Sequence, residues 1–314
     1  MSEMVDKLRN IALVGHGSSG KTSLAEIMLF KAGVTNRIGR VEDGNTVMDY
    51  EPEELRRQSS ISSSFHQFNW KKHTINIIDT PGDQNFFNDT KFCMPAADCA
   101  IFLIDAVDGI KVQTEQAWEF AREFDMPCVI FINKLDRERA DFTRAFEEAR
   151  GILDPKPIVL QLPIGKEASL KGVVDLARMK AYAYEADGKM KEIDIPADMK
   201  DTIESEREAF IENVAEADDE LIERYLEGEE ITNQELRDTL KKGILNRTFA
   251  PVLCGSATGN IGVDNLLDVI VSSMPSPVDR GHRTGTDLKG ENAVSREPDP
   301  DGPLSAFIFK TVAD

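Results

Sequence analysis

The feature that most constrains this chain is a glycine-rich run between a short apolar segment and an amphipathic helical pattern. The run Gly15-His16-Gly17-Ser18-Ser19-Gly20-Lys21-Thr22 fits the pattern G-x-x-x-x-G-K-[ST]. Residues 10–14 before it read as a buried strand, and residues 21–32 after it read as a helix that stops at Gly33. Loop N–H groups and a helix N-terminus both attract anions, so this order of elements predicts a phosphate-binding loop.

Each residue type in this loop has a chemical reason for its place. The glycines let backbone N–H groups wrap a chain of phosphates, and the predicted binding set runs from Gly15 through Ser23. Lys21 would reach the β- and γ-phosphates, and Thr22 would bind Mg²⁺. His16 belongs to this set by position, although a histidine here is better interpreted as a packing or backbone-capping residue than as a catalyst.

Short apolar strands alternate with helical patterns over the first 155 residues. Apolar runs at 75–79, 100–105 and 128–133 each end in polar turn residues, and helical patterns follow at about 112–124 and 138–150. This alternation predicts an α/β fold with a mainly parallel sheet covered by helices. Ligands of such folds bind at the carboxyl ends of the strands.

A second motif, Asp79-Thr80-Pro81-Gly82, lies at one of these strand ends. An aspartate in this position can hold Mg²⁺ through a water, and the N–H of Gly82 can sense a γ-phosphate. Alone, the tetrapeptide could be an ordinary turn. Its position downstream of a phosphate-binding loop favours a functional interpretation.

A third motif, Asn133-Lys134-Leu135-Asp136, ends the next apolar strand. The carboxylate of Asp136 can accept two hydrogen bonds from a base with adjacent N–H donors, which guanine offers and adenine does not. Unpaired buried polar groups are costly, so such a site rejects the wrong base. Gly255-Ser256-Ala257, after a later strand at 251–255, could place a backbone N–H near guanine O6.

The remaining segments divide the chain further. Residues 33–74 form a long polar stretch, including a flexible serine run at 59–64, that is either disordered or functional. An α+β subdomain is predicted as an insertion at 157–245 within a domain spanning 1–280, and it contains one long amphipathic helix at 201–226. A linker at 281–302 then precedes a strand at 304–311, which we interpret as the start of a truncated further domain at 303–314.

Charge and composition bound the class of protein. Hydrophobic residues at 41% and charged residues at 30% exclude a disordered or collagen-like chain. The net charge of −19 first suggests that nucleic acid is not a partner. However, residues 185–238 hold 20 acidic and 6 basic side chains, so most of the excess lies in the predicted insertion. The acidity therefore does not exclude a partner that contains RNA.

Cysteine usage and the N-terminal sequence favour the cytoplasm. Four cysteines occur without C-x-x-C spacing or a nearby histidine pattern, which is typical of free thiols in a reducing compartment. The N-terminus lacks the apolar core of a signal peptide, and no apolar run approaches the length of about 20 residues needed to span a membrane.

Taken together, these motifs resemble the translational GTPases, specifically the N-terminal part of elongation factor G. Further runs support the resemblance over essentially the whole chain: Asp105-Ala106-Val107-Asp108-Gly109, Lys171-Gly172-Val173-Val174-Asp175-Leu176 and Met274-Pro275-Ser276-Pro277. The resemblance implies GTP or GDP, Mg²⁺ and the ribosome as ligands and partner. It also implies a P-loop GTPase domain followed by a β-barrel domain whose first strand is residues 304–311.

The departures from the family's pattern concern the water-positioning residues. Gly17 and Ser18 stand where the family usually has a β-branched residue and then Asp, and residues 57–61 replace its Arg-Gly-Ile-Thr-Ile. Ser60 keeps the hydroxyl that would join Thr22 and, through water, Asp79 around Mg²⁺. Asp83 occupies the position of the family's catalytic histidine. These departures resemble the divergent paralogues called elongation factor G-like.

The altered residues suggest a mechanism in which hydrolysis is slow. An ionised Asp83 would add negative charge beside the γ-phosphate, so it would have to be protonated or swing away until the ribosome binds. Lys21 would stabilise charge in the reaction. Gln84 and Gln58 are possible substitutes for positioning water.

Three functional hypotheses follow. The leading one is a cytoplasmic, monomeric GTPase that couples nucleotide state to ribosomal translocation. Ribosomal RNA would lie near its switch segments, at about 38–64 and 79–92, and the large-subunit stalk protein would bind its acidic insertion. The second is a slowly hydrolysing, GTP-dependent ribosome-binding switch in recycling or ribosome protection. The third, an ATP-dependent metabolic enzyme, is disfavoured by residues 133–136.

Overall fold

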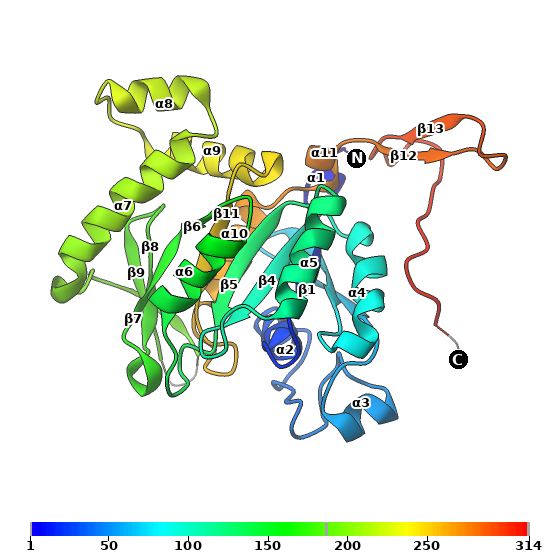
Figure 1. Ribbon diagram of the computed structural model, residues 1–314, viewed down its shortest axis with the longest axis horizontal. Helices are drawn as coiled ribbons and strands as arrows, with labels where there is room; N and C mark the ends of the chain where they lie inside the picture. The colour runs from blue at the N-terminus through cyan, green and yellow to red at the C-terminus, as the bar shows by residue number, and fades with distance from the viewer. Residues whose placement is uncertain (1, 186–187, 313–314) are drawn as a thin grey trace.

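The chain folds around a seven-stranded sheet (Figure 1). The structure, a computed structural model, describes residues 2–185 and 188–312. In spatial order the strands are β2 (Ser64–Trp70), β3 (His73–Asp79), β1 (Leu8–Val14), β4 (Cys99–Asp105), β5 (Cys128–Asn133), β11 (Ala250–Cys254) and β6 (Pro157–Val159). The edge strand β2 runs antiparallel to β3, and the other neighbours pair in parallel. The predicted mainly parallel sheet is confirmed.

Helices cover both faces of this sheet. In Figure 1, α5 and α6 lie in front of the strands and α10 lies behind them, where it contacts α2. Outside the inserted subdomain, the described helices are α1 (Ser2–Asp6), α2 (Lys21–Lys31), α3 (Pro52–Arg57), α4 (Phe87–Cys93), α5 (Val112–Glu123), α6 (Phe142–Ile152), α10 (Val263–Ser273) and α11 (Pro277–Arg280). Short 3₁₀ turns lie at Gln84–Phe86 and Met94–Ala96. Every residue of β4 and β5 is buried, as expected for central strands with helices on both faces.

The strand register aligns the motifs at one edge of the sheet. Leu13 of β1 pairs with Asp79 of β3, and Asp105 of β4 pairs with Asn133 of β5. The parallel strands therefore end at the same level, and the loops that follow β1, β3, β5 and β11 meet there. This is the edge at which parallel sheets bind ligands.

The inserted subdomain has its own antiparallel sheet, at the left of Figure 1. Its elements are β7 (Gln161–Ile164), β8 (Gly172–Asp175), β9 (Lys180–Tyr184), β10 (Met190–Ile193), α7 (Lys200–Ala215), α8 (Asp219–Leu226) and α9 (Asn233–Asn246), with 3₁₀ turns at Glu167–Ser169 and Ala197–Met199. The predicted range of 157–245 began too early, because β6 hydrogen-bonds to β11 in the main sheet.

The single helix predicted at 201–226 is wrong, since the structure has two helices with a break between them. Asp218 is extended, with φ −147°, and its side chain accepts hydrogen bonds from the N–H groups of Glu220 and Leu221. An aspartate in this role begins a new helix. By contrast, the predicted capping box of Thr232 and Glu235 is confirmed at the start of α9.

Two further expectations concern the polar stretch and the C-terminal region. Residues 33–74 include α3, β2 and the first residues of β3. The predicted linker at 281–302 contains a hairpin of β12 (Arg283–Thr286) and β13 (Ala293–Arg296). The strand predicted at 304–311 is wrong, because these residues join no described ladder, and a strand exists only through hydrogen bonds to a neighbour.

Two remaining features are the state of the cysteine side chains and the length and polarity of the helices. Cys93, Cys99, Cys128 and Cys254 are all buried, and each is a free thiol. Within residues 2–185 and 188–312, every helix is too short or too polar to span a bilayer.

Candidate functional site

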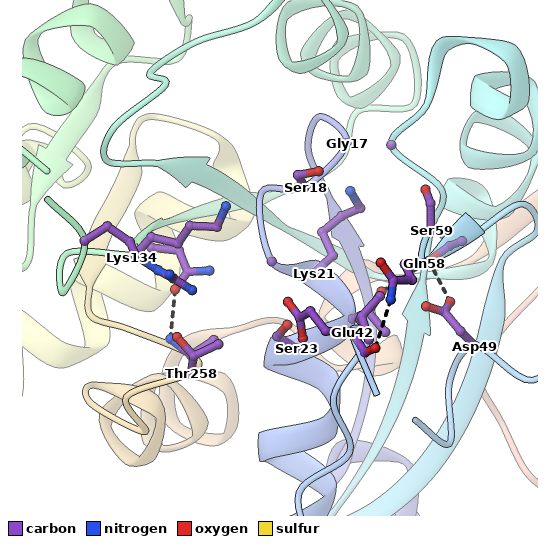
Figure 2. Close-up of a pocket in the computed structure, with 18 residues that line it drawn as sticks. Gly17, Ser18, Lys21, Ser23, Glu42, Asp49, Gln58, Ser59, Lys134 and Thr258 are labelled. Carbon is purple, nitrogen blue, oxygen red and sulfur yellow. Dashed lines mark hydrogen bonds between the residues drawn. The ribbon is translucent and has the colours of Figure 1, made fainter. Parts of the chain in front are cut away.

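A cleft opens at the sheet edge where the motif loops meet (Figure 2). Lys21 stands near its middle, with Lys134 and Thr258 on one side and Asp49, Gln58 and Ser59 on the other. The residues that line the cleft are Gly17, Ser18, Gly20, Lys21, Thr22, Ser23, Val41, Glu42, Asp49, Gln58, Ser59, Ser60, Gly82, Asn133, Lys134, Arg137, Ala257 and Thr258. Segments far apart in the sequence therefore build one site.

The conformation of the phosphate-binding loop depends on its glycines. Gly15 has φ 148° and Gly20 has φ 96°, which side-chain-bearing residues rarely adopt. A Cβ atom on Gly15 would lie 2.6 Å from the carbonyl oxygen of Leu103, and one on Gly20 would collide with the amide of Asn133. Close approach to β4 and β5 thus requires glycine at both positions.

The ammonium group of Lys21 is enclosed by this loop. Its Nζ donates hydrogen bonds to the carbonyl oxygens of Gly15 and His16, each at 2.9 Å. Burial lowers the pKa of Lys21 to about 8, and the nearby carboxylate of Asp79 opposes this shift. A buried ammonium at the start of a helix is well placed to bind phosphate oxygens.

The three predicted Mg²⁺ residues are brought together. Thr22 donates to Asp79 Oδ2 at 2.7 Å, and the hydroxyl oxygens of Thr22 and Ser60 lie 3.2 Å apart. Ser60 in turn donates to Asp49 Oδ1 at 2.7 Å (Figure 2). Asp49 was not predicted, because an acid 11 residues before Ser60 in a polar stretch carries no local signal.

This oxygen cluster fits Mg²⁺. Burial raises the pKa of Asp79 to about 7 and that of Asp49 to about 6. Asp79 Oδ1 and Asp49 Oδ2 are buried and have no hydrogen-bond partner within the described ranges. Unpaired buried carboxylate oxygens are costly, and hard oxygen donors are the ligands that Mg²⁺ prefers. A divalent cation would compensate this charge.

The opposite end of the cleft is organised by Asn133. Its amide donates to the carbonyl oxygen of Ser19 at 2.9 Å, and its Oδ1 accepts from the N–H of Ala257 at 2.9 Å. Lys134 lines the cleft and pairs with Asp105 at 2.7 Å. Asp136 Oδ1 is buried and meets no donor in the part of the chain that the structure describes. An unpaired carboxylate oxygen fits the predicted role of accepting from guanine.

The Gly255-Ser256-Ala257 loop departs from its prediction in one respect. The N–H groups of Gly255 and Ser256 donate to the carbonyl oxygens of Ile132 and Ile261, each at 3.0 Å, and that of Ala257 donates to Asn133. All three backbone donors therefore have partners within the protein. Ala257 still lines the cleft, and so does Thr258, which was not predicted.

Residues 79–84 are divided between the cleft and the surface. The hydroxyl of Thr80 donates to the carbonyl oxygen of Leu13, and Pro81 accepts from Thr90, each at 2.7 Å, while Gly82 lines the cleft. Asp83 is exposed, is outside the described cleft lining, and accepts two hydrogen bonds from Asn85 at 2.8 Å. The structure therefore does not bring Asp83 to the site.

The two alternative water-positioning residues are also separated. Gln58 lines the cleft, and its side-chain amide donates to the carbonyl oxygen of Glu42 at 2.8 Å (Figure 2). Gln84 is exposed and lies outside the described lining. Of the two, Gln58 is the one that can reach a ligand in the cleft.

His16 is buried behind the loop, with 4% of its surface exposed. Its Nδ1 lies 3.2 Å from the hydroxyl of Thr114, and its ring is outside the described cleft lining. Burial, with a smaller effect of Lys21, lowers the pKa of His16 to about 4. These contacts agree with the packing role inferred from the sequence.

The buried histidine should make the fold sensitive to acid. A histidine with a depressed pKa in the folded state contributes stability above pH 6.5 that is lost as pH falls toward 4. The shift corresponds to about 3 kcal/mol of the free energy of unfolding. We expect His16→Gln to lose less stability than the wild type between pH 7 and about 4.5 in urea unfolding. His282→Gln, at an exposed position, should lose stability with falling pH as the wild type does. If stability falls equally steeply with pH in the wild type and in both variants, the expectation is contradicted.

The fold and cleft define a P-loop nucleotide-binding domain. Residues 6–276 match the family described as Elongation factor Tu GTP binding domain, so the chain belongs to this family of GTP-binding domains. It is 39% identical over 312 residues to elongation factor G of Thermotoga maritima and, equally, to elongation factor G of a Thermotoga species, strain RQ2. Each match covers 99% of this chain and 45% of the relative.

A solved structure agrees with this assignment. A crystal structure of a Thermus thermophilus protein superposes with a TM-score of 0.82 at 33% identity, over 87% of this chain and 41% of that one. The resemblance to translational GTPases and to the N-terminal part of elongation factor G is confirmed. The chain spans less than half the length of these relatives.

Proposed function

We propose that this chain binds and hydrolyses GTP as part of a translation factor similar to elongation factor G, and couples nucleotide state to a ribosomal step such as translocation. The observation that carries the proposal is a single cleft with complementary ends. One end holds Lys21 beside the oxygen cluster of Thr22, Ser60 and Asp79. The other end holds Asn133 and Lys134, and Asp136, two residues further on and outside the described cleft lining, carries an unpaired carboxylate oxygen.

Each end has a defined task in this proposal. The loop from Gly15 to Ser23 holds the phosphates, and Lys21 stabilises negative charge on the β- and γ-phosphates. Thr22 and Ser60 bind Mg²⁺ directly, and Asp79 does so through water. Mg²⁺ supplies charge neutralisation on the phosphates when bound. Asp136 accepts hydrogen bonds from guanine, which selects GTP over ATP.

We infer that intrinsic hydrolysis is slow and that the ribosome stimulates it. Asp83 points to Asn85 instead of the cleft, so nothing at the family's histidine position holds a water in this arrangement. Gln58 is a neutral side chain in the cleft lining that could orient one. Ribosome binding would then have to rearrange residues 79–92.

The rate hypothesis is tested by Asp83→His in single-turnover GTP hydrolysis, with and without ribosomes. An imidazole can hold a water without adding negative charge, so we expect an increase of about tenfold or more, in the range of positioned acid–base groups. Glu297→His, at an exposed site directly after β13, should not change the rate. The hypothesis is wrong if wild type already matches a histidine-bearing homologue and Asp83→His has no effect.

The partners and compartment belong to the same proposal. The acidic helices α7 and α8 lie at the end of the molecule opposite α3 and α4 (Figure 1), which suits a docking surface for the large-subunit stalk protein, while the switch segments would face ribosomal RNA. We propose a monomer acting in the cytoplasm.

One observation favours a second candidate function. The exposed Asp83, together with Gly17 and Ser18 in the phosphate-binding loop, suits a slowly hydrolysing switch that acts in ribosome recycling or protection. GTP turnover by the full-length protein on purified ribosomes separates the two. Sustained multiple turnover supports the translocation-type factor, and a single slow round supports the switch. Tighter binding of ATP than GDP would refute both.

A further inference from the structure

A buried acid on α2 has no part in the proposed nucleotide site. Glu26 is fully buried and lies four residues after Thr22, on the same face of the helix. A buried carboxylate is stable only when hydrogen bonds compensate its charge. The partners of Glu26 therefore indicate what it is for.

Those partners are backbone groups of the polar segment that carries the Mg²⁺ residues. Glu26 Oε1 accepts hydrogen bonds from the N–H groups of Val47 at 2.6 Å and Met48 at 3.0 Å. The next residue is Asp49, which accepts the hydrogen bond from Ser60. Hydrogen bonds therefore connect α2, through residues 47–49, to the hydroxyl group of Ser60, which lies near that of Thr22.

The other side of the carboxylate is enclosed by Gly39. A Cβ atom at this position would collide with Glu26 Oε2 and lie 2.8 Å from the Cα atom of Thr46. Residues 39–48 therefore wrap closely around Glu26, and the fit depends on glycine. Oε2 itself meets no hydrogen-bond donor among the residues that the structure describes.

A second buried acid holds the chain beyond Ser60. Glu54, which is 2% exposed, accepts from the N–H groups of Ile61 at 3.0 Å and Ser62 at 3.2 Å. Ser60 therefore lies between two backbone segments that hydrogen-bond to buried carboxylates. Residues 47–48 bind Glu26 of α2, and residues 61–62 bind Glu54 of α3.

We propose that Glu26 is a positioning residue that docks residues 39–49 on α2, so that Ser60 is held where it can meet Mg²⁺ in the GTP state. This inference rests on the proposed function for its consequence, but the docking itself is independent of nucleotide. Glu26 acts through the backbone of Val47 and Met48. Its removal should free the segment without touching the phosphate-binding loop.

Hydrogen exchange of the Val47 and Met48 amides tests the docking in the nucleotide-free chain. We expect Glu26→Ala to speed exchange by about tenfold or more, the factor for losing hydrogen bonds to a charged acceptor. Glu26→Gln keeps a carbonyl oxygen that can accept both bonds and should restore most of the protection. Glu208→Ala, at an exposed position, should resemble wild type.

Gly39→Ala tests the same contact from the opposite side. Its Cβ atom would push against Glu26, so exchange at Val47 and Met48 should again accelerate. Gly151→Ala is the matched control, because a Cβ atom there meets nothing within 4 Å. If Glu26→Ala does not fold, Gly39→Ala and Glu26→Gln still decide the question. Unchanged exchange in these variants overturns the inference.

Nucleotide affinity separates positioning from general damage. With Mg²⁺ present, Glu26→Ala should bind a non-hydrolysable GTP analogue about tenfold more weakly and bind GDP within about twofold of wild type, because Ser60 serves the GTP state. Equal weakening of both nucleotides would indicate structural damage and overturn the inference. A wild-type chain without affinity for guanine nucleotides would refute the proposed function, while the exchange experiment would still judge the docking.

Discussion

Lys21→Met is expected to weaken binding of both GDP and GTP by about 100- to 1,000-fold, the cost of losing charge-assisted hydrogen bonds to phosphate in a buried site. The ammonium of Lys21 is enclosed by the loop and bound to the carbonyl oxygens of Gly15 and His16. Methionine keeps most of the apolar stem but provides no donor. Titration with a fluorescent GDP measures the effect directly.

The fold should survive this substitution. The pKa of Lys21 is lowered by burial, which means that holding its charge inside the loop costs free energy that methionine does not require. Thermal unfolding near pH 7 should therefore show a midpoint close to that of wild type. Lys191→Met, at an exposed position in β10, is the control for affinity. Binding of GDP by Lys21→Met within about threefold of wild type would show that the loop does not hold phosphates in the proposed way.

Apart from Ser60, which the family resemblance indicated, the predicted parts of the site that the structure brings together lie at or after strand ends. Lys21 and Thr22 follow β1, Asp79 ends β3 and Asn133 ends β5. Local apolar runs locate these strands, and parallel pairing then brings their carboxyl ends together without further information. These short motifs were sufficient to predict the site because strand pairing in the sheet brings them together.

Asp49 and Glu26 could not be predicted in the same way. Their roles depend on the path of residues 33–60 over α2, and that path is set by hydrogen bonds to the backbone of Val47 and Met48. Every residue except proline has a backbone N–H group, so the residue types do not reveal these hydrogen bonds. A buried glutamate in a helix looks like any other helical glutamate until its partners are known.

The errors in secondary structure have a related cause. Apolar spacing continues from α7 into α8, so periodicity alone predicts one helix, while the break comes from the capping role of Asp218 among many similar acids. Residues 304–311 have strand-like composition, but a strand also needs a hydrogen-bonding neighbour, and composition says nothing about that. Local sequence preference predicted the correct secondary structure only where the tertiary structure supported the same helix or strand.

Asp136→Asn is expected to change which base the site prefers. A carboxylate can accept hydrogen bonds from both N1–H and the 2-amino group of guanine. An amide places a donor in the position of one carboxylate oxygen, where it opposes the 2-amino group. Xanthine carries a carbonyl oxygen at that position and can accept from the new donor. We expect guanine affinity to fall by about 1,000-fold or more and xanthine to become the favoured base, as for other sites built on paired polar groups.

Competition of GDP and xanthosine diphosphate against a fluorescent nucleotide measures this reversal. The loops should stay in place, because Asn133 still joins the carbonyl oxygen of Ser19 to the N–H of Ala257. Glu138→Gln is a matched control, since it neutralises an exposed acid two residues away. Asp136→Asn that still prefers GDP would show that the unpaired Oδ1 of Asp136 does not face the base. Reversal would instead show that the carboxylate of Asp136 meets the N1–H and 2-amino edge of guanine.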